Sequence, residues 1–167
     1  MDQLWSILPV IWQPLLLLLI ANGAPILACR LWGSRFNQPL DGGLHFLDGR
    51  RLLGFTKTWR GLIASLIATT LCAPLMGVSW WLGSLCALLA ITGDVFSSFI
   101  KRRLSIEPHG RAVGLDQLPE SLIPLWILHD LFALDMGQAM LVALLFSLLE
   151  MLLSPILYRW HIRLRPY

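Results

Sequence analysis

A lone acid inside a long apolar run is the residue best suited to chemistry in this chain. Asp94 lies within that run, and Ser97 and Ser98 follow it at positions i+3 and i+4. Lys101 follows at i+7, so all of these side chains share one face of an α-helix. Because an ionisable group within a membrane span is costly, Asp94 is a candidate ligand for a metal or a substrate. The alternative is an ion pair with Lys101 or Arg102.

A basic cluster and a second acid follow Asp94. Lys101, Arg102 and Arg103 end the apolar run, and Asp116 opens the next one. Basic side chains neutralise phosphate chains, and carboxylate oxygens are ligands that Mg²⁺ prefers. Carboxylates that bracket a basic cluster can therefore hold a divalent cation and a polyphosphate together. The alternatives are a positive cluster at a membrane surface and an acid at a helix start.

Further donors stand at the start of another apolar run. Lys57, Thr58 and Arg60 lie at the point where the segment 61–78 begins. A helix N-terminus favours anions, and these side chains add hydrogen-bond donors there. They are candidate phosphate-binding groups.

Several other polar residues have two interpretations. Ser97 and Ser98 are either site ligands or serines that bond back to the carbonyl of residue i−4. Asn22 faces either the site or a neighbouring helix, and Asp41 is either a turn residue or part of the same polar site. Glu150 lies inside an apolar run, where it can pair within the bundle.

The composition indicates an integral membrane protein. The chain has 167 residues, of which 56% are hydrophobic and 14% charged, and its mean hydropathy is +0.68. These values lie far from those of soluble proteins. Cys29, Cys72 and Cys86 are isolated in the sequence, so neither a disulfide framework nor a zinc site is expected.

Apolar runs predict an all-α fold with about five transmembrane helices in a single domain, 1–167. A span needs about 20 mostly apolar residues. The predicted spans are about 7–29, 61–78, 80–100, 118–134 and 137–158. The fourth is short for a span, and the loops 30–60 and 101–117 are expected to be functional.

Lysine and arginine predict the orientation of the chain in the membrane. All 13 fall in the loops 30–60 and 101–117 or in the tail 159–165. Because positive loops stay on the cytoplasmic side, these segments are expected to face the cytoplasm, with the N-terminus outside a cell inner (cytoplasmic) membrane. The loop 30–60 is longer than a simple connection requires and is punctuated by glycines, as functional loops often are.

The motifs of covalent catalysis are missing from the sequence. It contains no Ser/His/Asp arrangement, no G-x-x-x-x-G-K-[ST] motif and no obvious nucleophile. The available residues favour positioning and charge neutralisation, which are the demands of phosphoryl or nucleotidyl transfer.

Taken together, these segments resemble the CDP-archaeol synthase family, which is related to the CDP-diacylglycerol synthases. The resemblance rests on LDGGLHFLDGRRLLGFTKTWRG (40–61), GDVFSSFIKRRL (93–104) and LDQLPE (115–120). It covers most of the chain from Asn22 to Glu120. It implies a CTP-dependent cytidylyltransferase that acts on a membrane lipid phosphate, either an archaeol-type ether lipid phosphate or a phosphatidate-like lipid, and releases pyrophosphate.

The resemblance also implies roles for individual residues. Asp94 and Asp116 would hold Mg²⁺ and would form the catalytic set with Lys101. Relatives often carry another acid shortly after the Asp-Gln pair, where this chain has Pro119 followed by Glu120. Either Glu120 replaces that acid as a metal ligand, or the metal site has fewer protein ligands. The predicted substrate-binding residues are Lys57, Thr58, Arg60, Ser97, Ser98, Arg102, Arg103 and Gln117.

Two other function classes compete with this interpretation. A non-catalytic membrane protein could bind anionic lipids or protein partners through the basic loops, but that role gives no reason for Asp94 beside Lys101. A transporter is disfavoured because the five runs show no paired repeats. The expected partners are CTP, a lipid phosphate and membrane lipids, with no nucleic acid.

Overall fold

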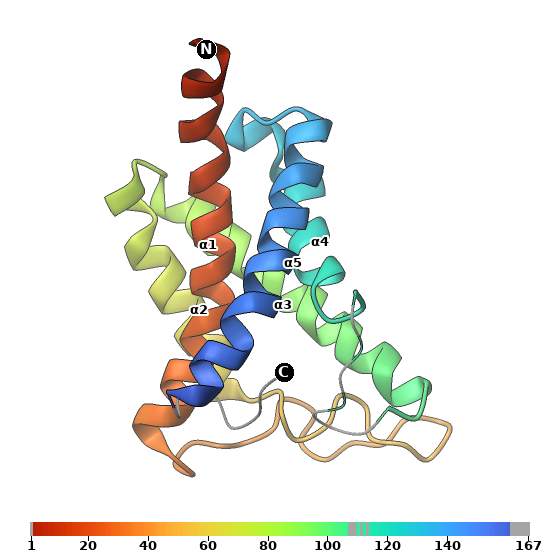
Figure 1. The fold of residues 1–167 in the computed structure, drawn as a ribbon. Coiled ribbons are helices and arrows are strands. Elements are labelled where there is room, and N and C mark those ends of the chain that lie inside the picture. The colour runs from red at the N-terminus through yellow and green to blue at the C-terminus, as the bar shows by residue number, and fades with distance from the viewer. Residues whose placement is uncertain (1, 107–109, 111, 113, 161–167) are drawn as a thin grey trace.

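The helices of the bundle follow the apolar runs of the sequence. The computed structural model describes residues 2–106, 110, 112 and 114–160, with the side chains of the first helix described from Val10 onward. Parts of the predicted loop 101–117 and of the tail therefore lie outside the described residues. The helices are α1 (Asp2–Trp32), α2 (Trp59–Cys72), α3 (Trp80–Arg103), α4 (Leu118–Leu128) and α5 (Met136–Arg159). The all-α prediction is confirmed (Figure 1).

Four segments in the described part of the chain are long and apolar enough to cross a membrane: Val10–Trp32, Trp59–Met76, Trp80–Arg103 and Met136–Arg159. The fourth predicted span has a different form. It consists of α4, which has 11 residues, and the 3₁₀ turn Asp130–Phe132. The turn ends at Ala133, whose backbone is left-handed with φ 54°.

Short connections make two helical hairpins. The 3₁₀ turn Pro74–Met76 joins α2 to α3, and Gly77 follows it with φ 75°. Asp135 begins α5 with a capping box, because its side chain accepts from the Gln138 N–H while the Gln138 side chain accepts from the Asp135 N–H. Both connections lie at one end of the bundle (Figure 1). We call the opposite end, where the first loop lies, the loop end.

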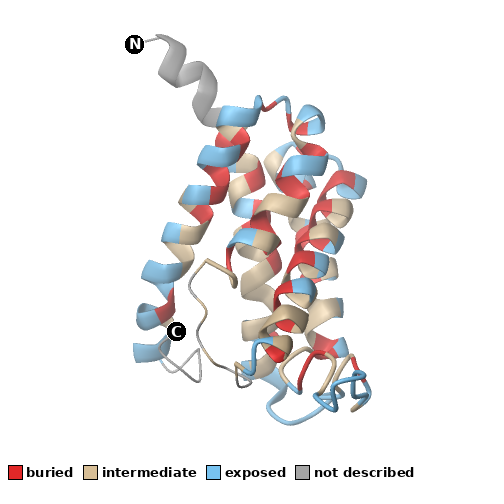
Figure 2. Cartoon of the chain, turned by 90° about the vertical axis from the view of Figure 1, so that its right-hand side faces the viewer, coloured by how far each residue is buried: buried red, intermediate tan, exposed pale blue. Residues whose placement is uncertain are grey.

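The core of the bundle is apolar, and so is much of its outer surface. Leu17 and Leu18 of α1 are buried in one cluster with Leu125 of α4 and Phe146 of α5. Figure 2 shows buried residues on the inward sides of the helices and exposed residues on the outward sides. The exposed side of α2 is also apolar, with Ile63, Ile67 and Leu71, as expected of a helix that faces lipid.

Two glycines allow α3 to approach its neighbours closely. A Cβ added at Gly93 would lie 2.2 Å from the Pro119 carbonyl oxygen and 2.6 Å from the Glu120 Cα. A Cβ added at Gly83 would lie 2.4 Å from the Ala73 Cβ. Both positions therefore need glycine to keep α3 against α4 and against the end of α2.

The first loop is folded across the loop end of the bundle. The Leu40 N–H donates to the Lys57 carbonyl at 2.8 Å, and the Trp59 N–H donates to the Gln38 carbonyl at 3.1 Å. Between these paired strand-like segments, residues 44–52 form a hairpin, closed by a hydrogen bond from the Leu52 N–H to the Leu44 carbonyl at 2.9 Å. The loop therefore carries its own hydrogen-bonded structure, and Figure 1 shows it beneath the helices.

Candidate active site

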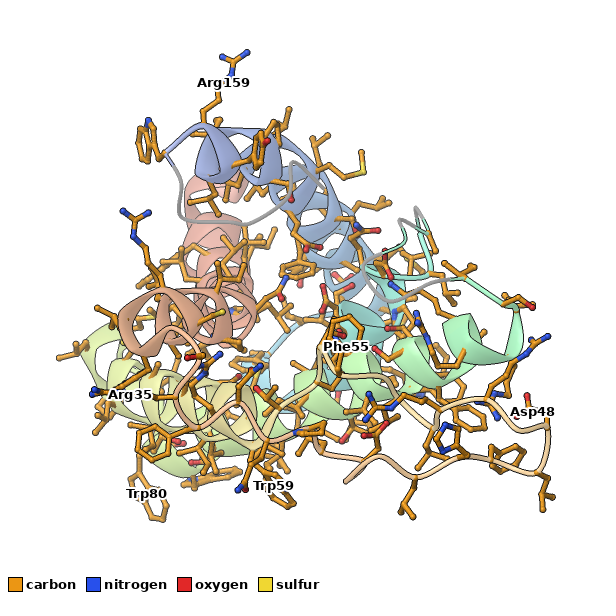
Figure 3. The ribbon with its side chains drawn as sticks, turned by 90° about the horizontal axis from the view of Figure 1, so that it is seen from below. Arg35, Asp48, Phe55, Trp59, Trp80 and Arg159 are labelled. Atoms are coloured by element: carbon orange, nitrogen blue, oxygen red, sulfur yellow. The ribbon has the colours of Figure 1, made fainter. Side chains whose placement is uncertain are left out.

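A polar cavity opens at the loop end of the bundle. Its volume is about 670 Å³, and it is lined by residues of α1, α2, α3, α5, the first loop and the start of α4. Figure 3 views this end from below and shows Phe55 of the first loop near its centre. Phe55 itself lines the cavity.

The cavity gathers most of the residues that the sequence singled out. The predicted site residues that line it are Lys57, Thr58, Arg60, Asp94, Ser98, Lys101, Arg102, Asp116, Gln117 and Glu120. Ser97 and Arg103 are not among the lining residues. Of the helix face that the sequence singled out, Asp94, Ser98 and Lys101 therefore line the cavity.

Asp94 is held by a lysine from the first loop. The Lys57 Nζ donates to the Asp94 Oδ1 at 2.5 Å and to its Oδ2 at 2.6 Å. Burial alone lowers the pKa of an ammonium group, but the Asp94 carboxylate together with Glu120 and Asp116 outweighs that effect and raises the pKa of Lys57 above its ordinary value. Lys57 is therefore a permanently charged donor beside Asp94. The sequence had suggested Lys101 or Arg102 as the partner.

Asp116 is held by the last turn of α3. The Lys101 Nζ donates to the Asp116 Oδ1 at 2.7 Å and to the Gly110 carbonyl at 3.1 Å. The other carboxylate oxygen accepts from the Ala112 N–H at 3.0 Å. Gln117 stabilises the same turn, since its Oε1 accepts from the Gly114 N–H at 3.0 Å. The chain thus returns from α3 to α4 with both acids facing one cavity.

Glu120 brings a third acid to the cavity, and two residues from other helices contact it. The Asn22 Nδ2 of α1 donates to the Glu120 Oε1 at 3.3 Å. Glu150 of α5 lies close to Glu120 and lines the same cavity. Of the two interpretations of Asn22, the structure therefore supports the one in which it faces the site.

Thr58 and Arg60 fix the start of α2. Thr58 is the N-cap residue, and its Oγ1 accepts from the Gly61 N–H at 3.2 Å. The Arg60 guanidinium donates to the carbonyls of Gly33 and Arg35 at 2.8 and 2.7 Å. Both residues thus connect the end of α1, the first loop and α2, and they also line the cavity.

Ser97 and Arg103 lie in different surroundings. The Ser97 Oγ donates to the Asp94 carbonyl at 2.9 Å, which is a bond within α3. Arg103 fastens the hairpin 44–52 to α3: its Nη1 lies 2.8 Å from the Asp48 Oδ1, and its guanidinium carbon lies 4.9 Å from the ring centroids of both Phe46 and Phe99. Figure 3 shows Asp48 at the edge of the molecule, beyond the end of α3.

The acids of the cavity supply hard oxygen donors from two sides. Asp94 comes from α3, whereas Asp116 and Glu120 come from the start of α4. Among residues 2–106, 110, 112 and 114–160, no group of three His, Cys, Asp or Glu side chains is arranged to hold a metal ion. The donor set has the chemistry that suits Mg²⁺, but Lys57 and Lys101 now lie against two of its members.

Glu150 was not among the predicted site residues. It lines the cavity with Asn22, although the two lie on α5 and α1, far apart in the sequence. The available signal was a polar side chain inside an apolar run, which by itself indicates a site or a pair. Only the packing of α1 against α5 distinguishes these two possibilities.

Comparison with known proteins assigns the chain to a family. The sequence model of the CarS-like CDP-archaeol synthases matches residues 7–167. The CDP-archaeol synthase of Pyrococcus furiosus is 31% identical over 160 residues, which cover 90% of this chain and 87% of that protein. The CDP-archaeol synthase of Pyrobaculum calidifontis is 34% identical over 164 residues, which cover 95% and 90% of the two chains.

A solved structure agrees with this assignment. An intramembrane enzyme for archaeal membrane lipids biosynthesis superposes with a TM-score of 0.68 and is 33% identical. The match covers 81% of this chain and 89% of that one. The family resemblance seen in the three sequence segments is confirmed: the chain is an integral membrane protein that belongs to the CDP-archaeol synthase family.

Proposed function

We propose that this protein transfers the cytidylyl group of CTP to the phosphate of an archaeol-type lipid, forming a CDP-activated lipid and pyrophosphate. The observation that carries the proposal is the cavity at the loop end, where Lys57, Asp94, Lys101 and Asp116 converge from the first loop, α3 and the start of α4. Membership of the CDP-archaeol synthase family supports the same activity.

The reaction needs positioned charge and no covalent enzyme intermediate. An oxygen of the lipid phosphate attacks the α-phosphorus of CTP, and the bond from that phosphorus to the oxygen bridging to the β-phosphorus breaks as pyrophosphate leaves. The Lys57 and Lys101 ammonium groups donate to phosphate oxygens after they exchange their aspartate partners for the nucleotide. Arg102, which also lines the cavity, adds a further positive charge.

We propose Mg²⁺ as the cofactor because the cavity offers several carboxylates. Asp94 and Asp116 would hold it, with Glu120 as a further ligand. When bound, Mg²⁺ offsets charge on the triphosphate and on the leaving pyrophosphate. The protein's own part is to bring Asp94 of α3 and Asp116, which precedes α4, to one cavity.

The position of the cavity suits two substrates that arrive from different phases. CTP would enter from the aqueous side at the loop end, which we propose is the cytoplasm because the basic loops lie there. The lipid tails would remain in the membrane, among the apolar outer surfaces of the helices.

The test is transfer of label from [α-³²P]CTP into an organic-soluble product by purified protein in detergent with Mg²⁺. An unsaturated isoprenoid glycerol phosphate would be compared with phosphatidic acid, which distinguishes the two lipid classes. We expect transfer to the isoprenoid lipid and loss of transfer on chelation. Asp94→Asn should lower turnover by at least about 100-fold, since it removes a charge from the reacting centre.

Asp130→Asn is the matched control. Its carboxylate is 89% exposed and lies in the link between α4 and α5, at the end of the bundle away from the cavity. It should leave transfer unchanged. Full turnover by a folded Asp94→Asn variant, or no transfer to either lipid by the folded unmodified protein, would count against the proposal.

A further inference from the structure

Asp41 is the best satisfied carboxylate of the first loop, although it lies outside the cavity lining. Its side chain is fully buried. The Oδ1 accepts from the Gly43 N–H at 3.0 Å and from the Arg51 Nη2 at 3.1 Å. The Oδ2 accepts from the Leu53 N–H at 3.2 Å and the Gly54 N–H at 3.0 Å. One carboxylate therefore binds backbone N–H groups on both sides of the hairpin 44–52, at Gly43 before it and at Leu53 and Gly54 after it.

The hydrogen bonds of Asp41 lie next to those that hold Lys57. Leu40, the residue before Asp41, donates its N–H to the Lys57 carbonyl at 2.8 Å. Pro39 pairs with Thr58 in an antiparallel bridge. Gly54, which donates to Asp41, precedes Lys57 by only three residues. The backbone of Lys57 is thus fixed from both directions by a segment that Asp41 organises.

Lys57 needs this support because it comes from a loop. Its ammonium group reaches Asp94 on α3, which is 37 residues away in the sequence. Lys101, the other lysine of the cavity, is placed by the last turn of a helix. The backbone of Lys57 belongs to no helix. Its position therefore depends on the buried hydrogen bonds around Asp41.

We infer that Asp41 is a positioning residue for nucleotide binding and that it acts through Lys57. The inference rests on the proposed function, in which Lys57 moves from Asp94 to the phosphates of CTP. Asparagine at position 41 would keep the size of the side chain but present an NH₂ group to backbone N–H donors. The loop would then lose at least one buried hydrogen-bond acceptor, and the backbone of Lys57 would no longer be held in one position.

A double-mutant cycle tests this inference with the full-length protein in detergent. The measured quantity is the Kd of radiolabelled CTP in the presence of Mg²⁺, for the unmodified protein, Asp41→Asn, Lys57→Gln and the double variant. Asp48→Asn is the matched control, because Asp48 is a carboxylate of the same loop whose partners are the Arg50 N–H and Arg103. Thermal unfolding of each variant reports its stability separately.

We expect Asp41→Asn to weaken CTP binding by about tenfold, which corresponds to about 1.4 kcal/mol. In the Lys57→Gln background, Asp41→Asn should have no further effect, because the residue through which it acts is already gone. Asp48→Asn should leave CTP binding unchanged in both backgrounds. A merely structural role for Asp41 would instead lower affinity by the same factor with and without Lys57.

The outcomes separate the inference from the proposed function. Additive effects in the cycle, or unchanged affinity in Asp41→Asn, would overturn the inference alone. Absence of CTP binding by the folded unmodified protein would overturn the proposed function and the inference with it. If Asp41→Asn does not fold, Arg51→Gln replaces it: loss of the 3.1 Å ion pair should weaken CTP binding by about threefold, again only when Lys57 is present.

Discussion

Two lysines hold two aspartates across the cavity. Lys57 bonds both oxygens of Asp94, and Lys101 bonds Asp116 at 2.7 Å. Each pair is partly exposed, so its contribution to stability is modest compared with that of a fully buried pair. Their importance lies in position, because four charges are held at the place where an anionic nucleotide would bind.

A contrast between Lys101 and Arg103 tests which basic residues of α3 serve the reaction. Lys101→Met removes a donor inside the cavity, so turnover should fall by about 100-fold. Arg103→Met removes a donor that fastens the hairpin 44–52, so it should change turnover by less than about threefold while lowering Tm by about 3 °C. Steady-state kinetics and thermal unfolding check both. Equal losses of turnover would indicate that Arg103 also contacts substrate, as the sequence predicted.

The surroundings of Asp41 predict a dependence of stability on pH. Burial alone would raise its pKa, but the N–H groups of Gly43, Gly54 and Leu53 and the charge of Arg51 together lower it below the ordinary 3.8. A depressed carboxyl pKa stabilises the fold above the unfolded-state value, and this contribution is lost as pH falls through the folded value. The Tm difference between unmodified protein and Asp41→Asn should therefore be constant above about pH 5 and shrink below pH 3.8.

Thermal unfolding at a series of pH values measures that difference. Asp48→Asn serves as the comparison, because Asp48 is a half-exposed carboxylate of the same loop. A Tm difference for Asp41→Asn that grew as the pH fell would contradict the assignment.

Individual site residues were more predictable than their partners. Asp94 and Lys101 lie on one face of α3, about two turns apart, so regular helical spacing is enough to predict that they point the same way. The bond between Lys57 and Asp94 could not be predicted in this way, because Lys57 belongs to a loop without periodicity. The spacing from Asp94 predicted Ser97 and Ser98 equally as site residues. The Ser97 hydroxyl, however, donates to the Asp94 carbonyl within the helix. The two serines point about 100° apart around the helix, and of the two only Ser98 lines the cavity.

At the scale of elements, α3 positions the site by its close contact with α4. Gly93 precedes Asp94 and faces the Pro119 carbonyl and the Glu120 Cα. This contact brings Glu120 of α4, and Asp116 just before that helix, near Asp94 of α3. Pro119 lies in the first turn of α4, where its missing N–H would have no helical partner in any case. The departure from the family pattern at Pro119 and Glu120 is therefore compatible with an ordinary helix start.

Gly93→Ala should separate α3 from α4. The added Cβ would overlap backbone atoms, which cannot move as a flexible side chain does, so the free energy of unfolding should fall by about 1–3 kcal/mol. Turnover should fall with it, because Asp94 and Glu120 would move apart. Gly23→Ala is the control: its Cβ would meet no atom within 4 Å, and alanine favours a helix. A stable and active Gly93→Ala variant would show that the contact is not needed.

Apolar runs predicted the helices better than the connections between them. The expected spans 61–78, 80–100 and 137–158 correspond to α2 with its 3₁₀ turn, α3 and α5. The fourth run was expected to reach 134, but α4 ends at Leu128. The polar residues His129 and Asp130 follow this end directly, but Leu131, Phe132, Ala133 and Leu134 are apolar again, so the run read as one longer span. The folded structure of the first loop was likewise unpredictable, since it depends on Asp41 reaching backbone groups far along the chain.

For the whole molecule, the arrangement is strongly one-sided. The cavity, the first loop and the end of α3 lie at the loop end, whereas both short helical connections lie at the other end (Figure 1). The positive loops predict that the loop end faces the cytoplasm. Where the structure describes these loops they lie side by side, since the Arg50 side chain donates to the Arg103 carbonyl at 2.6 Å. Loops that face one side of a membrane must lie at the same end of the bundle.

Cysteine labelling in intact cells tests this orientation. Leu47 is 96% exposed in the hairpin 44–52, and Leu75 is 85% exposed in the link between α2 and α3. In a variant without native cysteines, Leu75→Cys should react with a membrane-impermeant maleimide in intact cells. Leu47→Cys should react only after the cells are permeabilised. The reverse pattern would invert the proposed topology while leaving the fold unchanged.

The close contacts of α3 also govern how the chain can diverge between species. At Gly83 and Gly93 any larger residue would require a neighbouring helix to move, so these positions can change only together with their surroundings. The outward residues Ile63, Ile67 and Leu71 of α2 are half or more exposed and can exchange freely among apolar types. Exchanges at these outward positions should leave the cavity unchanged, because none of the three residues lines it. Lineages whose membranes differ in thickness or fluidity can adapt that surface without altering the site.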